Sequence, residues 1–183
     1  RGITLNDLQY PRAIYTLWSE AERNAINIYE VEIDKTNYKN ENWFINTDIT
    51  YSFDGTNVTG SYGTATAKAH ADTLWTAQDE TDGLGTEGEV ATRGLKYNLI
   101  QTVKAQAAGL LAETDWYITR KSEKNTAIPS AITTHRNAVR SKQAAMETAI
   151  TNASDTAALE TLYTATKQDD GTVARPLGQL PTL

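Results

Sequence analysis

The stretch "LLAETDWYITRKSEKNTAIPSAITTHRNAVRSK", residues 110–142, decides the fold of the C-terminal half of the chain. Thr114 can cap a helix over "DWYITRKSEK", and Asp115 falls in its first turn, where the helix dipole favours an acid. Pro129 then opens the longest helix, which runs to about residue 153, because proline is favoured at the first helical position. The stretch therefore predicts two consecutive helices joined by a short turn.

The longest predicted helix carries one narrow apolar stripe. Its apolar positions are spaced by seven residues, with Ile150 beside them: Ile132, Val139, Met146 and Ala153. A stripe about one helix wide predicts packing against a single neighbour or an interface. The preceding segment, residues 95–112, predicts another helix, with one apolar face made of Leu95, Leu99, Val103, Ala107 and Leu110.

The end of the chain predicts a short helix and then an arm. Asp155 can cap a helix that carries Leu159, Leu162 and Tyr163. The closing "DDGTVARPLGQLPTL", residues 169–183, contains two prolines and two glycines. This composition predicts an extended arm that is suited to reach a neighbouring chain.

Residues 64–94 predict a helix followed by an acidic loop. The alanine-rich "TATAKAHADTLWTAQ", residues 64–78, indicates the helix, and "DETDGLGTEGEVATRG" indicates the loop. Four oxygen-bearing residues fall in the register of an EF-hand calcium loop with Gly83 at its turn: Gln78, Glu80, Asp82 and Glu89. Gln78 lacks the charge of the usual first ligand, and Gly85 stands where an apolar residue is expected. We therefore favour a solvated loop and keep calcium as the alternative.

The N-terminal segment, residues 1–62, reads as a small β-rich unit with one helix. Ser19 and Glu22 form a capping-box pattern at the start of that helix. The segment "IYEVEID", residues 28–34, alternates as a half-buried strand does. Residues 49–62 predict a hairpin that turns at Asp54-Gly55. The expected fold class is α+β, with a β-rich unit over 1–62, a helical module over 63–168 and an extended arm over 169–183.

Composition bounds the class of function. The 183-residue chain has a formal net charge of -6, which argues against nucleic acid as a partner. It contains no cysteine, so thiolate metal sites and cysteine nucleophiles are excluded. No apolar run is long enough to predict a membrane span. His70 and His135 lack metal-ligand spacing, and no nucleophile-elbow motif is present, so we expect no catalytic residues, no cofactor and no enzyme.

The charged aromatic block after Leu111 has two interpretations. One is a pocket for an anionic or sugar ligand. The other is a structural clamp, in which Trp116 is buried and an acid on the first helix pairs with an arginine on the second. We favour the clamp and expect Asp115 or Glu123 near Arg136 or Arg140. Its full set is Asp115, Trp116, Tyr117, Arg120, Glu123, Arg136 and Arg140.

The same block resembles a C-terminal module of tailed-phage virion and tail-fibre-related proteins. The resemblance lies in a Leu-Leu pair, a Thr-Asp-Trp-Tyr block, an Arg and a Glu, a turn to Pro, and an Arg-x-x-x-Arg spacing. These are Leu110, Leu111, Thr114 to Tyr117, Arg120, Glu123, Pro129, Arg136 and Arg140. The opening "LQYPRAIYTLWSEAERNAINIYEVE" also looks like such proteins, and "RPLGQLPTL" resembles small virion proteins of marine phages.

The resemblance implies a non-enzymatic structural component of a phage particle, in the tail or fibre apparatus. It implies other virion proteins as partners and several symmetric copies of the chain. Because the long repetitive shaft of fibre adhesins is missing, a connector or adaptor is favoured. A capsid decoration protein, a receptor- or glycan-binding tip and a tail-fibre assembly factor remain as alternatives.

Overall fold

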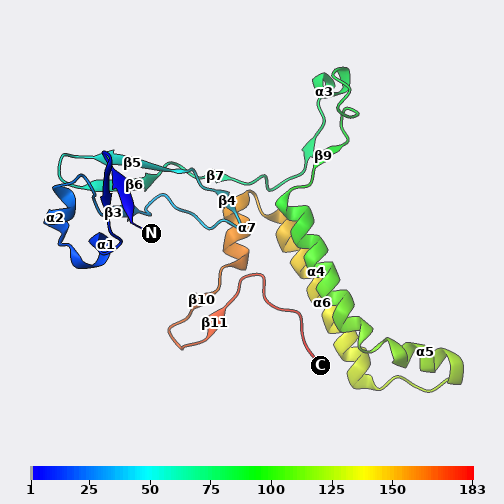
Figure 1. The fold of residues 1–183 in the computed structure, drawn as a ribbon. Helices are drawn as coiled ribbons and strands as arrows, with labels where there is room; N and C mark the ends of the chain where they lie inside the picture. The colour runs from blue at the N-terminus through cyan, green and yellow to red at the C-terminus, as the bar shows by residue number, and fades with distance from the viewer. Residues whose placement is uncertain (1) are drawn as a thin grey trace. The chain divides into compact units, whose positions relative to one another are not determined.

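The computed structural model describes residues 2–183, which form two compact units, the first ending at residue 66 and the second covering 67–183. Short strands dominate the first unit, whereas long helices dominate the second (Figure 1). This mixture confirms the predicted α+β class.

The first unit begins with a hairpin and two short helices. Strands β1 (Ile3–Leu5) and β2 (Leu8–Tyr10) pair antiparallel across Asn6 and Asp7, which both have positive φ angles. One helix was predicted, but two form: α1 (Ile14–Leu17) and α2 (Glu20–Asn24). The extended backbone of Trp18 and Ser19 separates them, and the predicted Ser19–Glu22 capping box at the start of α2 is confirmed.

A three-stranded sheet completes the first unit. Strands β5 (Ile49–Phe53) and β6 (Val58–Tyr62) form the predicted hairpin, and β3 (Val31–Asp34) pairs parallel with β6. The Asp54 carboxylate holds the turn by accepting hydrogen bonds from two backbone N–H groups, those of Thr56 and Asn57, at 2.8 Å each. Two short strands, β4 (Phe44–Ile45) and β7 (Thr66–Ala67), are also present.

The predicted helix over residues 64–78 is wrong. The segment instead contains strand β8 (Thr73–Leu74), which pairs with β9 (Val90–Thr92), and only Ala77–Thr81 forms a helix, α3. The carbonyl oxygen of Ala69 accepts a hydrogen bond from the N–H of Leu95 at 2.9 Å, and the carboxylate of Asp72 accepts one from Gly94 at 2.8 Å. These tertiary bonds draw the backbone away from a helix, so they override the helix propensity of alanine.

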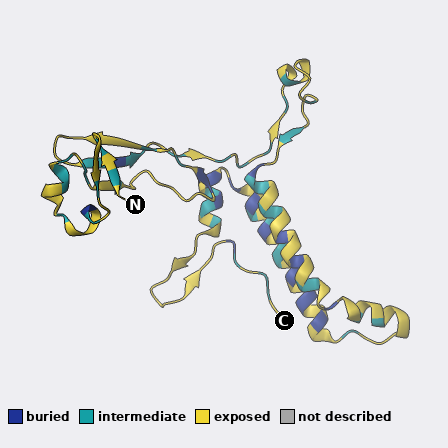
Figure 2. Ribbon diagram, viewed as in Figure 1, coloured by how far each residue is buried: buried dark blue, intermediate teal, exposed yellow. Residues whose placement is uncertain are grey.

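Two antiparallel helices form the core of the second unit. Helices α4 (Leu95–Ala112) and α6 (Ser130–Asn152) lie side by side, and α5 (Asp115–Lys124) connects them at one end (Figure 1). All five predicted stripe residues are buried, four in α6 and Ala153 directly after it, with the exposed fraction of each at 8% or less: Ile132, Val139, Met146, Ile150 and Ala153. Figure 2 shows the buried positions running along the pair. Val103 and Ala107 of α4 are buried as well, so α4 is the main neighbour of α6, which also contacts the helix that follows it.

The C-terminal part of the second unit is more folded than predicted. Asp155 caps α7 (Thr156–Tyr163) as predicted, through a hydrogen bond from the N–H of Ala158. Strands β10 (Thr166–Lys167) and β11 (Val173–Ala174) then form a small hairpin. The expected arm over 169–183 therefore contains a strand, and Leu177 within it is buried. Every helix of the described chain is too short or too polar to cross a lipid bilayer.

Candidate functional site

The turn between α4 and α5 is held by a buried arginine of α6. One terminal nitrogen of Arg136, Nη1, donates to the carbonyl oxygen of Leu111 at 2.7 Å and to the hydroxyl of Thr114 at 2.6 Å. The other nitrogen, Nη2, forms an ion pair with Asp115 Oδ1 at 2.8 Å. We call Leu111, Thr114, Asp115 and Arg136 the Arg136 cluster. It fixes the start of α5 on α6, and it confirms the predicted acid–arginine pair.

The Thr114 hydroxyl does not cap α5 as predicted. It donates to the carbonyl oxygen of Leu111 at 3.0 Å and accepts from Arg136, so it is already bound on both sides. Thr114 is 2% exposed and Arg136 is 7% exposed. A buried guanidinium is tolerated where a carboxylate and further acceptors surround it. The turn therefore supplies the hydrogen-bond acceptors that hold the Arg136 guanidinium.

Trp116 was predicted to be buried, and this prediction is wrong. Its side chain is 51% exposed, and α5 contributes no buried residue to the described structure. Asp115 points to Arg136, and the next residue along a helix lies about 100° further round the axis, which places Trp116 away from α6. The contact with Arg136 thus determines which side of α5 faces water.

Trp116, Tyr117 and Arg120 form a stacked group on α5, which we call the α5 patch. The ring centroids of Trp116 and Tyr117 lie 3.7 Å apart with the planes tilted by 31°. The guanidinium carbon of Arg120 lies 4.7 Å from the Trp116 centroid and 5.1 Å from the Tyr117 centroid. Both contacts are within cation–π range. The patch is therefore ordered by its own contacts while Trp116 stays accessible.

Two predicted members of the clamp do not join it. Within residues 2–183, Glu123 and Arg140 form no ion pair. Both side chains are exposed. Arg140 follows Arg136 by four residues, but the acceptors of the α4–α5 turn are already taken by Arg136. The clamp therefore has one acid–arginine pair rather than a network.

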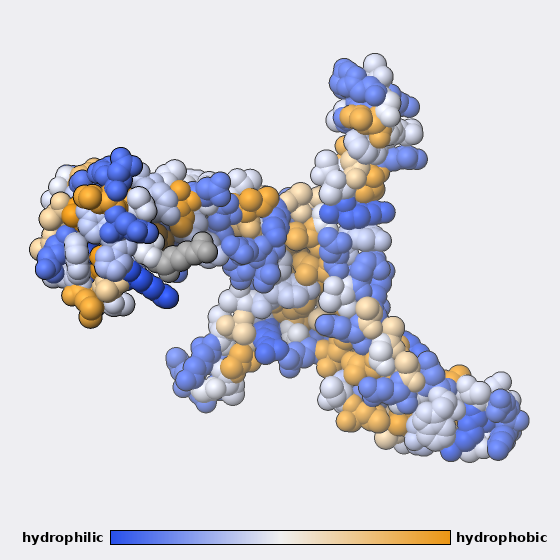
Figure 3. All heavy atoms as spheres, in the orientation of Figure 1, coloured by the Kyte–Doolittle hydropathy of each residue, from blue (hydrophilic) through white to orange (hydrophobic). Residues whose placement is uncertain are grey.

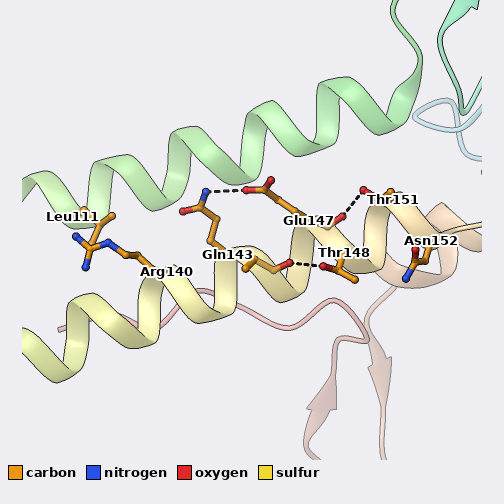
Figure 4. Close-up of a pocket in the computed structure, with 8 residues that line it drawn as sticks. Leu111, Arg140, Gln143, Glu147, Thr148, Thr151 and Asn152 are labelled. Carbon is orange, nitrogen blue, oxygen red and sulfur yellow. Dashed lines mark hydrogen bonds between the residues drawn. The ribbon is translucent and has the colours of Figure 1, made fainter.

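Arg140 instead lines an open groove along α6 (Figure 4). The groove contains one row of mainly polar side chains from α6 together with Leu111: Arg140, Gln143, Ala144, Glu147, Thr148, Thr151 and Asn152. Gln143 donates to Glu147 at 2.8 Å, and Glu147 forms an ion pair with Lys104 of α4 at 3.6 Å. The hydroxyls of Thr148 and Thr151 donate to carbonyl oxygens of their own helix. Most polar groups of this row are thus already paired, which is typical of a solvated helix face.

The acidic loop lacks the frame of an EF-hand. The helix expected before it does not form, and Gln78 and Glu80 lie inside α3 rather than along a loop. Gln78 donates to Asp82 at 2.8 Å. In the described chain, no three His, Cys, Asp or Glu side chains are grouped to hold a metal ion.

A capped turn at the tip of a hairpin occupies the segment for which calcium binding was the alternative. Strands β8 and β9 form the hairpin, and Thr76 and Asp79 form a capping box at the start of α3. The hydrogen bond from the Thr76 hydroxyl, followed by that from its N–H, lowers the pKa of Asp79. This carboxylate therefore serves to start the helix.

The two histidines lie apart and in different settings. His135 is buried in α6, and its Nε2 atom has no hydrogen-bond partner. His70 is half-buried, and its carbonyl oxygen accepts a hydrogen bond from the N–H of Lys96 at 3.0 Å. Both settings fit packing roles.

Sequence reasoning missed two parts of this region. The first is the role of Thr114 and of the Leu111 carbonyl as acceptors for Arg136, which becomes visible only when α6 folds back on α4. The second is the burial of Leu177 near α7, where its N–H donates to the carbonyl oxygen of Leu162 at 3.0 Å. A leucine inside a proline- and glycine-rich ending was the one available signal.

The α5 patch has the chemistry of a contact surface: Trp116 is exposed, Tyr117 and Arg120 are half-buried beside it, and a buried arginine holds their helix in place. Comparisons with protein-family models, with curated proteins and with solved structures find no match to this chain. A function for the chain therefore has to be argued from its own residues and from the resemblance that they carry.

Proposed function

We propose that the chain is a non-enzymatic virion structural protein of a tailed bacteriophage. In this proposal it is a connector or adaptor of the tail or fibre region, present in several copies and bound to other virion proteins. The Leu110–Arg140 pattern, which resembles a module of such proteins, gives the direction. The observation that carries a contact role is the accessible α5 patch, held in place by the Arg136 cluster.

The composition of the α5 patch suits protein–protein binding. Trp, Tyr and Arg are the residue types most enriched among those that contribute most binding energy at interfaces. Here one of each is stacked on a single helix, and Trp116 is 51% exposed. Because the stacking already restricts these side chains, less conformational entropy is lost when a partner covers them.

The charge around the patch favours an acidic partner surface. Residues 114–153 hold six Lys or Arg and three Asp or Glu, whereas the whole chain has a net charge of -6. Lys121 and Lys124 lie in the last turn of α5. Complementary charge at the rim of an interface mainly speeds association and selects the partner. An acidic virion protein, or an acidic surface of another copy, fits this arrangement.

Locating the chain in purified phage particles tests the proposal. We expect quantitative mass spectrometry to find a fixed number of copies in each particle, with enrichment in isolated tails. A tail location would separate the adaptor from a capsid decoration protein. Absence from mature particles would contradict the structural role and favour a tail-fibre assembly factor.

A glycan-binding tip is the second candidate, because exposed tryptophan faces can stack on sugar rings. The exposure of Trp116 is the observation that favours it. This role is tested by titrating the purified chain with glycans of the host surface while the tryptophan fluorescence of the chain is recorded. Glycan binding that is lost in Trp116→Ala would support a glycan-binding role. An unchanged fluorescence signal with every glycan would contradict it.

A further inference from the structure

In the second unit, the C-terminal segment closes one side of a groove that α4, α6 and α7 border. The groove is lined by Thr102, Val103 and Gln106 of α4, Met146 of α6, Leu162 and Tyr163 of α7, and the C-terminal residues Ala165, Arg175, Leu177, Gly178, Gln179 and Leu180. In the view of Figure 3, apolar residues gather where this segment lies beside the helical pair. The segment thus forms one wall of a space that three helices border.

Two contacts anchor residues 175–180 beside the groove. Leu177 is 6% exposed, and its N–H donates to the Leu162 carbonyl oxygen at 3.0 Å. Gly178 has a φ of +76°, and the side chain of Lys142 occupies the space where a β-carbon would lie. A larger residue at 178 would therefore be strained by this backbone conformation, and the end of the Lys142 side chain would have to move.

The connection that leads to this segment is weakly held. Of the described residues 164–183, Leu177 alone is buried, and every residue of 164–176 is exposed. Within that connection, β10 and β11 pair over two residues each. A two-stranded hairpin of this kind is marginally stable in water. When fully extended, residues 164–176 can span roughly 43–47 Å.

We propose that residues 175–180 act as an exchangeable clasp, which binds the α4–α6–α7 groove of a second copy of the chain in the assembled state. The contacts with a neighbour's groove are the same as those within one chain. The choice between them therefore depends on the local concentration of each groove. In a multi-copy assembly a neighbouring groove within reach competes with the chain's own groove, as in domain swapping.

Cysteine cross-linking between two distinguishable chains tests the clasp, because the chain has no cysteine of its own. One chain carries Gln106→Cys on α4 and a heavy-isotope label, and the other carries Gln179→Cys and no label. Both positions line the groove and are exposed. After mild oxidation, mass spectrometry counts disulfides that join position 106 of one chain to position 179 of the other. Gln101→Cys, an exposed α4 position outside the groove lining, replaces Gln106→Cys as the control.

We expect the mixed disulfide to exceed that of the Gln101→Cys control and to rise as the chains are concentrated toward about 1 mM. Leu177→Asp in the unlabelled chain should lower it by about tenfold or more, because a buried leucine anchors the segment. Val173→Asp, a matched change at an exposed position of the same arm, should leave it unchanged. An added peptide of residues 173–183 should compete, and the same peptide with Leu177→Asp should not.

A mixed disulfide no higher than the control, or one that Leu177→Asp does not lower, would overturn the clasp. A failure of the natural peptide to compete would also overturn it, and this arm does not depend on how a variant folds. The inference rests on the multi-copy state in the proposed function, but it is measured on the purified chain. Its failure would leave the presence of the chain in phage particles untouched, and the particle experiment would decide that separately.

Discussion

At the scale of single residues, Arg136 is the side chain that holds the α4–α5 turn against α6. Its two terminal nitrogens are shared among a carbonyl oxygen, a hydroxyl and a carboxylate, all within 2.8 Å. Asp115 is 61% exposed at its side chain, so the ion pair by itself contributes modestly. The bonds from the buried guanidinium to Leu111 and Thr114 are the costlier ones to lose.

Replacing Arg136 with lysine tests how much the hydrogen bonds to Leu111 and Thr114 contribute to stability. A lysine keeps the charge but cannot reproduce the planar set of donors. We expect Arg136→Lys to lower the free energy of unfolding by about 2 kcal/mol. Arg140→Lys, one helical turn away at an exposed position, should change it by less than about 0.5 kcal/mol. Denaturant unfolding followed by helical circular dichroism measures both, and equal losses would contradict a special role for Arg136.

The hydrogen-bonded carboxylate of Asp72 is expected to make the stability of the fold depend on pH. The hydrogen bond from the Gly94 N–H, followed by the contact with Arg93, lowers the pKa of the Asp72 carboxyl. A group with a lowered folded-state pKa stabilises the fold above its unfolded-state pKa, and this contribution is lost as pH falls through the folded-state pKa. We expect melting temperatures to fall below about pH 4, and to fall less steeply in Asp72→Asn. Parallel pH curves for both proteins would contradict this role.

At the scale of elements, the sequence predicts which side of a single helix is buried, but it does not predict most contacts between elements. The seven-residue spacing of α6 predicted its buried side because that spacing depends on one helix alone. The Asp115–Arg136 pair followed from two helices joined by a short turn. The exposure of Trp116 was missed because the bonds of Arg136 to the turn set the rotation of α5. The true structure of residues 64–78 was missed because their backbone and side chains bond to residues 94 and 95.

Two glycines at the ends of α4 predict opposite effects of one substitution. A β-carbon at Gly109 would meet nothing within 4 Å, so Gly109→Ala should stabilise the helix by about 0.5–1 kcal/mol. A β-carbon at Gly94 would collide with the carbonyl group of Ala71. Gly94→Ala should therefore destabilise the second unit. Thermal unfolding of both variants checks the signs, and a stabilising Gly94→Ala would contradict the close packing of this segment.

At the scale of the whole molecule, the division into two compact units predicts independent folding. The second unit contains its own core along α4, α6 and α7, including the fully buried Leu159. We expect residues 67–183, produced alone, to show a helical circular dichroism spectrum and a cooperative thermal transition. The same Arg136→Lys substitution should lower the stability of this fragment as it does in the full chain. A fragment without a cooperative transition would contradict the division.

The exposed Trp116 of the α5 patch gives the proposed assembly a residue-level prediction. If another virion protein covers Trp116, replacing this tryptophan with alanine removes contact area from the interface. Tryptophan is among the residue types that contribute most binding energy at interfaces. A loss of about 2 kcal/mol at such a position weakens binding roughly 30-fold. Tyr51, an aromatic residue of the first unit that is 64% exposed, supplies a matched substitution outside the patch.

The copy number of the chain in purified phage particles tests the proposed virion role most directly. Quantitative mass spectrometry would compare particles grown with the natural chain, with Trp116→Ala and with Tyr51→Ala. We predict a fixed copy number for the natural chain and for Tyr51→Ala, and a clear loss for Trp116→Ala. Absence of the natural chain from the particles would contradict the virion role, and equal incorporation of all three chains would contradict the role of Trp116 in assembly.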